Sequence, residues 1–176
     1  TFSKAAIEVC EGQQLDMDFE QQSTVTIDDY IQMITLKTAV LLGASLQIGA
    51  ITAYATEADI ENIYRFGIHL GIAFQLQDDM LDVYGSQEKF GKKNGGDIVA
   101  NKKTYIYLKA LELANAEQKN TLAELYQSGN TNPEQKIKEV TTLFDALNVK
   151  DHVSALMQDY YDQSFLFLDQ TSAEPV

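Results

Sequence analysis

Apolar residues recur along this chain at the three- and four-residue spacings of α-helices, and no long run alternates apolar and polar residues as a strand does. Polar, glycine or proline breaks divide the pattern into separate helices. We expect these helices over residues 2–19, 28–54, 56–84, 104–127, 132–148 and 150–168. Thr26 or Asp28 can cap the second helix, and Thr56 with Asp59 resembles a capping box for the third. The pattern therefore predicts an all-α, multi-helix bundle.

The second predicted helix is unusually apolar. From Thr38 to Tyr54 it has 17 residues without charge, which is at the short limit for a bilayer span, and several of them are polar. We interpret it as a fully buried core helix and expect no transmembrane segment. Lys37 is then a lone cation among apolar residues, which is costly unless its amine meets an anion or extends to solvent.

Three aspartates interrupt the apolar end of the third predicted helix. Asp78 and Asp82, four residues apart, share one face, and Asp79 lies three residues before Asp82. Because apolar residues surround them, these acids should repel one another and lose hydration. A divalent metal would relieve both effects, and Mg²⁺ suits because it takes one or two carboxylates together with water and phosphate oxygens. The alternative is an acidic helix edge exposed to solvent.

A basic segment rich in glycine follows this acidic helix. Residues 85–104 contain four glycines, five lysines and no proline, which predicts a flexible loop. Metal-bound carboxylates on one side and lysines on the other can bind a diphosphate between them. A loop of this composition alone would be an ordinary solvated connection, so its position beside the aspartates is what favours a binding role.

Composition narrows the class of protein. The 176 residues suffice for one domain with a core, and the formal net charge of −13 argues against binding to nucleic acid or to anionic membrane surfaces. Cys10 is the one cysteine, so no internal disulfide can form and a reducing compartment, the cytoplasm, is expected. We expect Cys10 to be a buried small side chain.

Together these segments resemble the trans-isoprenyl diphosphate synthases, the prenyltransferases that make farnesyl, geranylgeranyl and longer diphosphates. The family's second aspartate-rich region is similar to the stretch FGIHLGIAFQLQDDMLDVYGSQEKFGKKNGGDIVANKKT. Upstream, Glu11–Asp16 (EGQQLD) resembles the family's GQxxD segment, and Lys37–Thr38 resembles its Lys-Thr pair. The resemblance implies the all-α isoprenoid synthase fold, present as a single partial domain over residues 1–176.

The resemblance also implies roles for particular side chains. The expected Mg²⁺ ligands are Asp78, Asp79 and Asp82, with Asp16 and Asp97 acting through water. The residues expected to bind substrate are Gln13, Lys37, Thr38, Phe74, Gln75, Lys92 and Lys102. Five of these are also expected to take part in catalysis: Lys37, Thr38, Gln75, Lys92 and Lys102. Lys93 and Lys103 are expected to be solvated.

The implied reaction is an ionisation followed by a condensation. Several Mg²⁺ ions and lysines stabilise the diphosphate that leaves an allylic substrate, and isopentenyl diphosphate attacks the resulting cation. No protein nucleophile is needed, which agrees with the lack of any convincing Ser-His or Cys-His pattern in the sequence. The resemblance further implies a homodimer.

The chain departs from the family pattern at its beginning. Family members carry a first aspartate-rich region well over a hundred residues before the second, whereas 77 residues precede Asp78 here and contain no DDxxD. The family's early Gly-Lys-Arg residues, its isopentenyl-diphosphate-binding His and its Arg pair are also missing. The first residue is Thr1, and Ser172–Pro175 resembles a helix start. We therefore interpret the chain as the C-terminal half of a synthase, with half of the active site and no activity alone.

Alternatives to an enzyme remain at this point. The chain could be a non-catalytic module that binds metal and diphosphate, or a regulatory subunit of a heteromeric prenyl synthase. Retention of the aspartates and of Lys37, Gln75, Lys92 and Lys102 favours the enzyme. A terpene cyclase shares the helical architecture, but the Lys-Thr pair and the lysine-rich loop argue against it.

Overall fold

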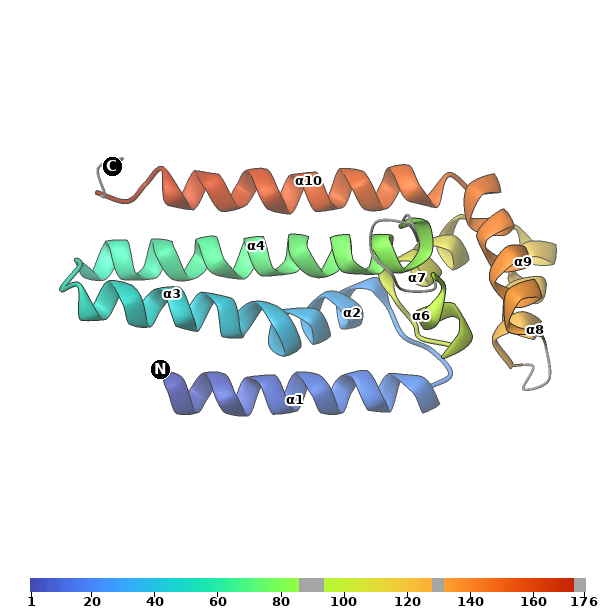
Figure 1. The fold of residues 1–176 in the computed structure, drawn as a ribbon, viewed down its shortest axis with the longest axis horizontal. Helices are drawn as coiled ribbons and strands as arrows, with labels where there is room; N and C mark the ends of the chain where they lie inside the picture. The colour runs from blue at the N-terminus through green and yellow to red at the C-terminus, as the bar shows by residue number, and fades with distance from the viewer. Residues whose placement is uncertain (86–93, 128–131, 173–176) are drawn as a thin grey trace. The chain divides into compact units, whose positions relative to one another are not determined.

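Every regular element in the described part of the chain, residues 1–85, 94–127 and 132–172 of a computed structural model, is a helix, as the sequence predicts. The chain forms two compact units. The first consists of Thr1–Asp18, Ile31–Gln75 and Leu156–Val176, and the second of Phe19–Tyr30 and Leu76–Ala155. Figure 1 shows the helices and their labels.

The first unit is a layer of long helices. It contains most of α1 (Phe2–Gln21), a π-helical turn (Thr35–Ala39), α3 (Val40–Thr52), the first part of α4 (Glu57–Tyr84) and the end of α10 (Val149–Leu168). The long helices follow one another in the order α1, α3, α4 and α10 in Figure 1. Ala5, Val40 and Ala44 form a core cluster between α1 and α3. Phe66 of α4 packs edge-on against Phe165 of α10, with ring centroids 5.8 Å apart.

Small residues let neighbouring helices of this unit approach closely. A Cβ on Gly67 of α4 would lie 2.6 Å from the Cα of Gly43 in α3, and one on Gly71 would lie 2.6 Å from the Cα of Ala39. Gly12 of α1 packs against the backbone of Lys37 in the same way, since a Cβ there would lie 2.7 Å from the Lys37 Cα. These contacts fix α1 and α4 against the two sides of the π-helical turn.

The second unit is built around an apolar core formed by helices of different lengths. It contains the first residues of α2 (Ile27–Ile34), the end of α4, α6 (Gly96–Val99), α7 (Tyr105–Leu113), α8 (Ala116–Gln127), α9 (Pro133–Ala146) and the start of α10. Its fully buried side chains include Leu76, Ile98, Ile106, Leu122, Val140, Phe144 and Val153.

Capping residues explain the starts of α2 and α4. Thr26 caps α2 through a reciprocal pair, because its Oγ1 accepts from the Asp29 amide at 3.1 Å and the Asp29 carboxylate accepts from the Thr26 amide at 2.9 Å. Thr56 and Asp59 form the predicted capping box of α4. The Asp59 carboxylate also accepts hydrogen bonds from Ser172, which joins α4 to the segment after α10. These bonds and the one from Thr56 lower the pKa of Asp59.

Three expectations for the elements are wrong. The predicted helix over residues 104–127 is two helices, because α7 ends at Leu113 and Asn115 caps α8 in a reciprocal pair with Gln118. The helical stretch Ile27–Thr52 is long and apolar enough to cross a membrane by length and composition alone, which is weak evidence. Only 28% of its apolar 18-residue window is buried, however. It is therefore not a fully buried core helix within this chain. Cys10 is exposed rather than buried.

Candidate active site

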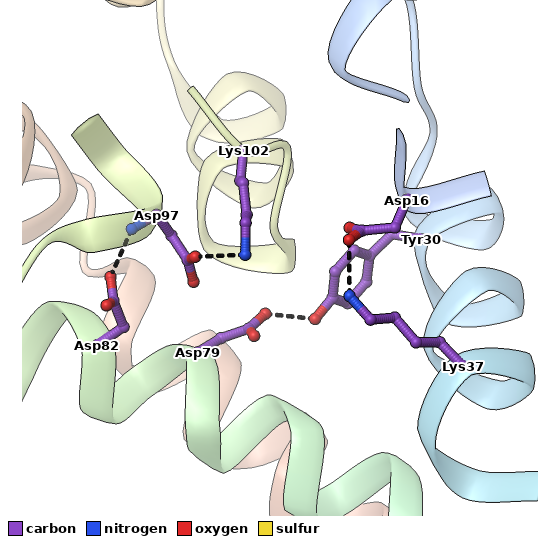
Figure 2. Close-up of polar contacts among 7 residues, drawn as sticks. All are labelled: Asp16, Tyr30, Lys37, Asp79, Asp82, Asp97 and Lys102. Carbon is purple, nitrogen blue, oxygen red and sulfur yellow. Dashed lines mark hydrogen bonds and ion pairs between the residues drawn. The ribbon is translucent and has the colours of Figure 1, made fainter. Parts of the chain in front are cut away.

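The first unit brings Lys37 and Asp16 together. Lys37 lies in the π-helical turn and donates from Nζ to the Asp16 Oδ2 of α1 at 2.6 Å (Figure 2). The close approach of Gly12, one turn before Asp16, places the two helices near enough for this ion pair. Asp16 is therefore an anion beside Lys37, where the sequence led us to expect substrate diphosphate. Both side chains remain partly exposed, at 31% and 19%.

The next residue of the same turn reaches α4. The Thr38 hydroxyl donates to the Gln75 side-chain oxygen at 2.8 Å, which joins two residues predicted to act on substrate. Extra residues in a π-helical turn shift the side chains that follow, and such turns are frequent at functional sites. Gln13 is exposed on α1, and Phe74 is 60% exposed beside Gln75. An apolar ring so open to solvent is consistent with the predicted contact to substrate rather than with core packing.

The second unit buries one of the three aspartates of α4. Asp79 is 5% exposed and accepts a hydrogen bond from the phenol of Tyr30 on α2, which is 2% exposed (Figure 2). A buried carboxylate needs donors to replace lost water, and the phenol is one of them. Tyr30 was missed in the sequence, because its partner lies 49 residues away and no local pattern pairs them.

Partly exposed contacts in the same unit connect Asp82, Asp97 and Lys102. The Asp97 amide at the start of α6 donates to Asp82 Oδ2 at 3.0 Å, and Lys102 Nζ lies 2.9 Å from Asp97 Oδ1 (Figure 2). Gly95, at φ 85°, makes the turn that brings α6 back to the end of α4. Burial raises the pKa of Asp82 and the Asp97 charge adds to this, whereas the amide hydrogen bonds oppose it.

The three aspartates of α4 do not converge on one point. Asp78 is exposed, whereas Asp79 and Asp82 are held by Tyr30 and by the Asp97 amide. Among the described residues no group of three His, Cys, Asp or Glu side chains is arranged to hold a metal ion. The donor set nevertheless fits Mg²⁺, because this ion takes few protein ligands and completes its shell with water and phosphate oxygens. Asp78 offers an exposed carboxylate, and Asp82, which accepts hydrogen bonds from the Gly96 and Asp97 amides, lies one helical turn further on.

The predictions for the lysines that follow α4 differ in their outcomes. Lys92 and Lys93 lie outside the described residues. Lys103 is not solvated as expected, because its Nζ donates to the main-chain oxygens of Phe19 and Gln22, and burial lowers its pKa. Lys102, 39% exposed and paired with Asp97, is the described lysine of this segment that can also reach a ligand.

The side chains of these clusters are of the types that bind phosphate and Mg²⁺. In one unit Lys102 and an accessible carboxylate lie on adjacent elements, and in the other Lys37 and Thr38 can donate to phosphate oxygens. Asp16 pairs with Lys37, and Asp97 pairs with Lys102. Each unit thus carries a polar cluster of the kind that binds phosphate.

Comparison with known proteins identifies the fold. Residues 1–144 match the family model described as polyprenyl synthetase. A short chain isoprenyl diphosphate synthase of Methanocaldococcus jannaschii is 43% identical over 137 residues, which are 78% of this chain and 41% of the relative. A geranylgeranyl diphosphate synthase of Methanosarcina mazei is 35% identical over 167 residues, 95% of this chain and 49% of the relative.

Solved structures agree. A crystal structure of geranylgeranyl pyrophosphate synthase, 41% identical, covers 99% of this chain and 54% of its own with a TM-score of 0.92. Polyprenyl synthase from Caulobacter crescentus, complexed with calcium and isoprenyl diphosphate, is 26% identical over 98% of this chain and 52% of its own, with a TM-score of 0.90. The chain thus spans about half the length of the proteins it matches, and it belongs to the polyprenyl synthetase family.

Proposed function

We propose that the full-length protein is a Mg²⁺-dependent prenyltransferase that condenses isopentenyl diphosphate with an allylic diphosphate. The observation that carries the proposal is the clustering of Lys102, Asp97 and Asp82, one helical turn after Asp78, in a chain of the polyprenyl synthetase family. The relatives' names range from short chain to geranylgeranyl and geranylfarnesyl diphosphate synthase, so the proposal extends to the reaction class and not to the product length.

The proposed roles follow from charge and donor type. Asp78 and Asp82 hold Mg²⁺ with the substrate diphosphate, and Asp79, Asp16 and Asp97 act through water or through their partners. Mg²⁺ supplies positive charge against the diphosphate oxygens. In the second unit Lys102 and Lys92 add positive charge against a substrate diphosphate. In the first unit Lys37 does the same, and Thr38 and Gln75 orient the diphosphate that it meets. Gln13 and Phe74 contact the substrate.

The proposal also includes assembly and location. We expect a homodimer in the cytoplasm that binds no nucleic acid, which is supported by the family resemblance and by the net charge of −13. Exposed apolar side chains of the first unit, Leu41 and Ile51 among them, are surfaces that further protein can cover.

The first test removes the exposed carboxylate. We expect Asp78→Ala in the full-length protein to weaken Mg²⁺-dependent binding of inorganic diphosphate by at least about tenfold, since losing even an outer partner of a metal site typically costs that much. Calorimetric titration measures this affinity. Glu61→Ala is the matched control, because Glu61 is an exposed carboxylate on the same helix.

Two results would separate the alternatives. Unchanged affinity in Asp78→Ala would remove this residue from the metal site. A full-length wild-type protein that binds Mg²⁺ and diphosphate but forms no product from the two substrates would favour the non-catalytic module or regulatory subunit.

A further inference from the structure

A buried lysine on α9 has no part in the proposed reaction. Lys136 is 4% exposed, although lysine is seldom buried without a partner. Its Nζ donates to the Asn101 side-chain oxygen and lies 5.1 Å from the centre of the Tyr126 ring. Burial lowers the pKa of this amine, which marks the cost of holding a cation here. Because an apolar side chain would fill the same space without this cost, we expect Lys136 to have a role that depends on its amine.

The partner of Lys136 belongs to the turn that presents Lys102. Asn101 has a left-handed backbone, with φ 56°, and its amide donates to the Ile98 carbonyl at 3.2 Å. The following Lys102 amide donates to the Asp97 carbonyl at 2.9 Å, and the Lys102 amine pairs with the Asp97 carboxylate. The hydrogen bond from Lys136 therefore holds the residue immediately before Lys102.

The same turn is anchored on two other sides. Lys103, immediately after Lys102, donates to the carbonyls of Phe19 and Gln22. Gly95, before α6, packs against Ile137 of α9, and a Cβ there would lie 2.6 Å from the Ile137 Cγ1. Both neighbours of Lys102 are thus held by side-chain contacts, whereas Lys102 itself keeps 39% of its side chain exposed. The arrangement fixes the backbone and leaves the ammonium accessible.

We propose that Lys136 and Asn101 are positioning residues, which hold the turn of Lys102 and Asp97 so that the Lys102 ammonium is oriented for diphosphate before the ligand arrives. The inference rests on the proposed function, because it deepens the role given there to Lys102. A lysine side chain is long and flexible. Fixing its backbone beforehand therefore lowers the conformational entropy that is lost when the ligand binds. Neither Lys136 nor Asn101 needs to touch the ligand.

The test measures binding of inorganic diphosphate to the full-length protein in Mg²⁺ by calorimetry. We expect Lys136→Met, which keeps the length of the side chain but removes its charge and donor, to weaken binding on the order of tenfold, as loss of a supporting partner does. Lys138→Met is the matched control, because Lys138 is an exposed lysine on the same helix. The melting temperature of Lys136→Met should not fall, since the substitution removes a buried charge.

A second variant and the double variant complete the test. Asn101→Gly removes the acceptor but accommodates the left-handed backbone, so it should weaken binding as much as Lys136→Met, and the double variant should bind no more weakly than either. Losses that multiply in the double variant, or wild-type affinity in either single variant, would overturn the positioning role. The positioning role would also be overturned if weaker binding were accompanied by a lower melting temperature in both single variants. Wild-type protein that binds no diphosphate would overturn the proposed function and this role together.

Discussion

At the scale of single residues, the main feature is a buried carboxylate held by a buried phenol. Asp79 and Tyr30 are both almost fully enclosed, and they join the aspartate-rich end of α4 to the start of α2. A carboxylate in such surroundings is stable only with donors around it. Asp79 therefore acts in this unit as a structural centre as well as a member of the aspartate motif.

Removing the phenol hydroxyl should weaken this centre. We expect Tyr30→Phe to lower the free energy of unfolding by about 1–3 kcal/mol, because Asp79 then remains buried with one donor fewer. Urea unfolding of wild type and variant measures the difference. Tyr54→Phe is the control, because Tyr54 is 95% exposed. A Tyr30→Phe variant as stable as Tyr54→Phe would contradict the importance of the hydrogen bond.

The sequence indicated candidate side chains, but it did not indicate which residues they contact in the structure. Lys37 was expected to need an anion because its neighbours in the chain are apolar, and Asp16 supplies one. Tyr30 and Lys136 were not identified, since each gains its role from a residue far along the chain, Asp79 and Asn101. Such pairings depend on how helices pack, which no local pattern records.

At the scale of elements, helix ends were predictable wherever a capping residue stands before an apolar run. Thr56 and Pro133 mark the starts of α4 and α9 as expected. The break between α7 and α8 was not expected, because Ala114 and Asn115 interrupt the helix without glycine or proline. The reciprocal hydrogen bonds of Asn115 and Gln118 form a capping box. Asn favours helix starts over helix interiors, so this signal was present in the sequence but was overlooked.

Glycine contacts between α3 and α4 offer a test of the packing in the first unit. We expect Gly67→Ala to destabilise the protein by about 1–3 kcal/mol, because the new methyl group would overlap the backbone of Gly43 and force the helices apart. Thermal or urea unfolding measures the loss.

The same unit contains a matched control for this substitution. Gly49 lies in α3 with nothing within 4 Å of an added Cβ, so Gly49→Ala should leave stability unchanged or raise it by up to about 1 kcal/mol through helix propensity. If both alanine variants gave the same change, close packing at Gly67 would be ruled out.

At the scale of the whole molecule, the first unit leaves many apolar side chains uncovered. Large exposed examples are Phe2, Ile7, Leu41, Ile51, Phe74 and Leu166. Scattered apolar residues are normal on a protein surface, but so many on one unit favour association with further protein. The chain spans about half the length of its relatives, which agrees with an apolar surface that further protein covers.

This leads to a prediction about activity. We expect the 176-residue chain alone to show no detectable condensation of isopentenyl diphosphate with an allylic diphosphate, even if it retains weak binding of Mg²⁺ and inorganic diphosphate. Ionisation needs several positive charges around one leaving group, and groups that act together fail together, with losses of about 10³ or more. A radiolabelled assay that compares product formation by the chain and by the full-length protein tests this prediction. Turnover by the chain within about tenfold of the full-length protein would show that the described clusters form a sufficient active site.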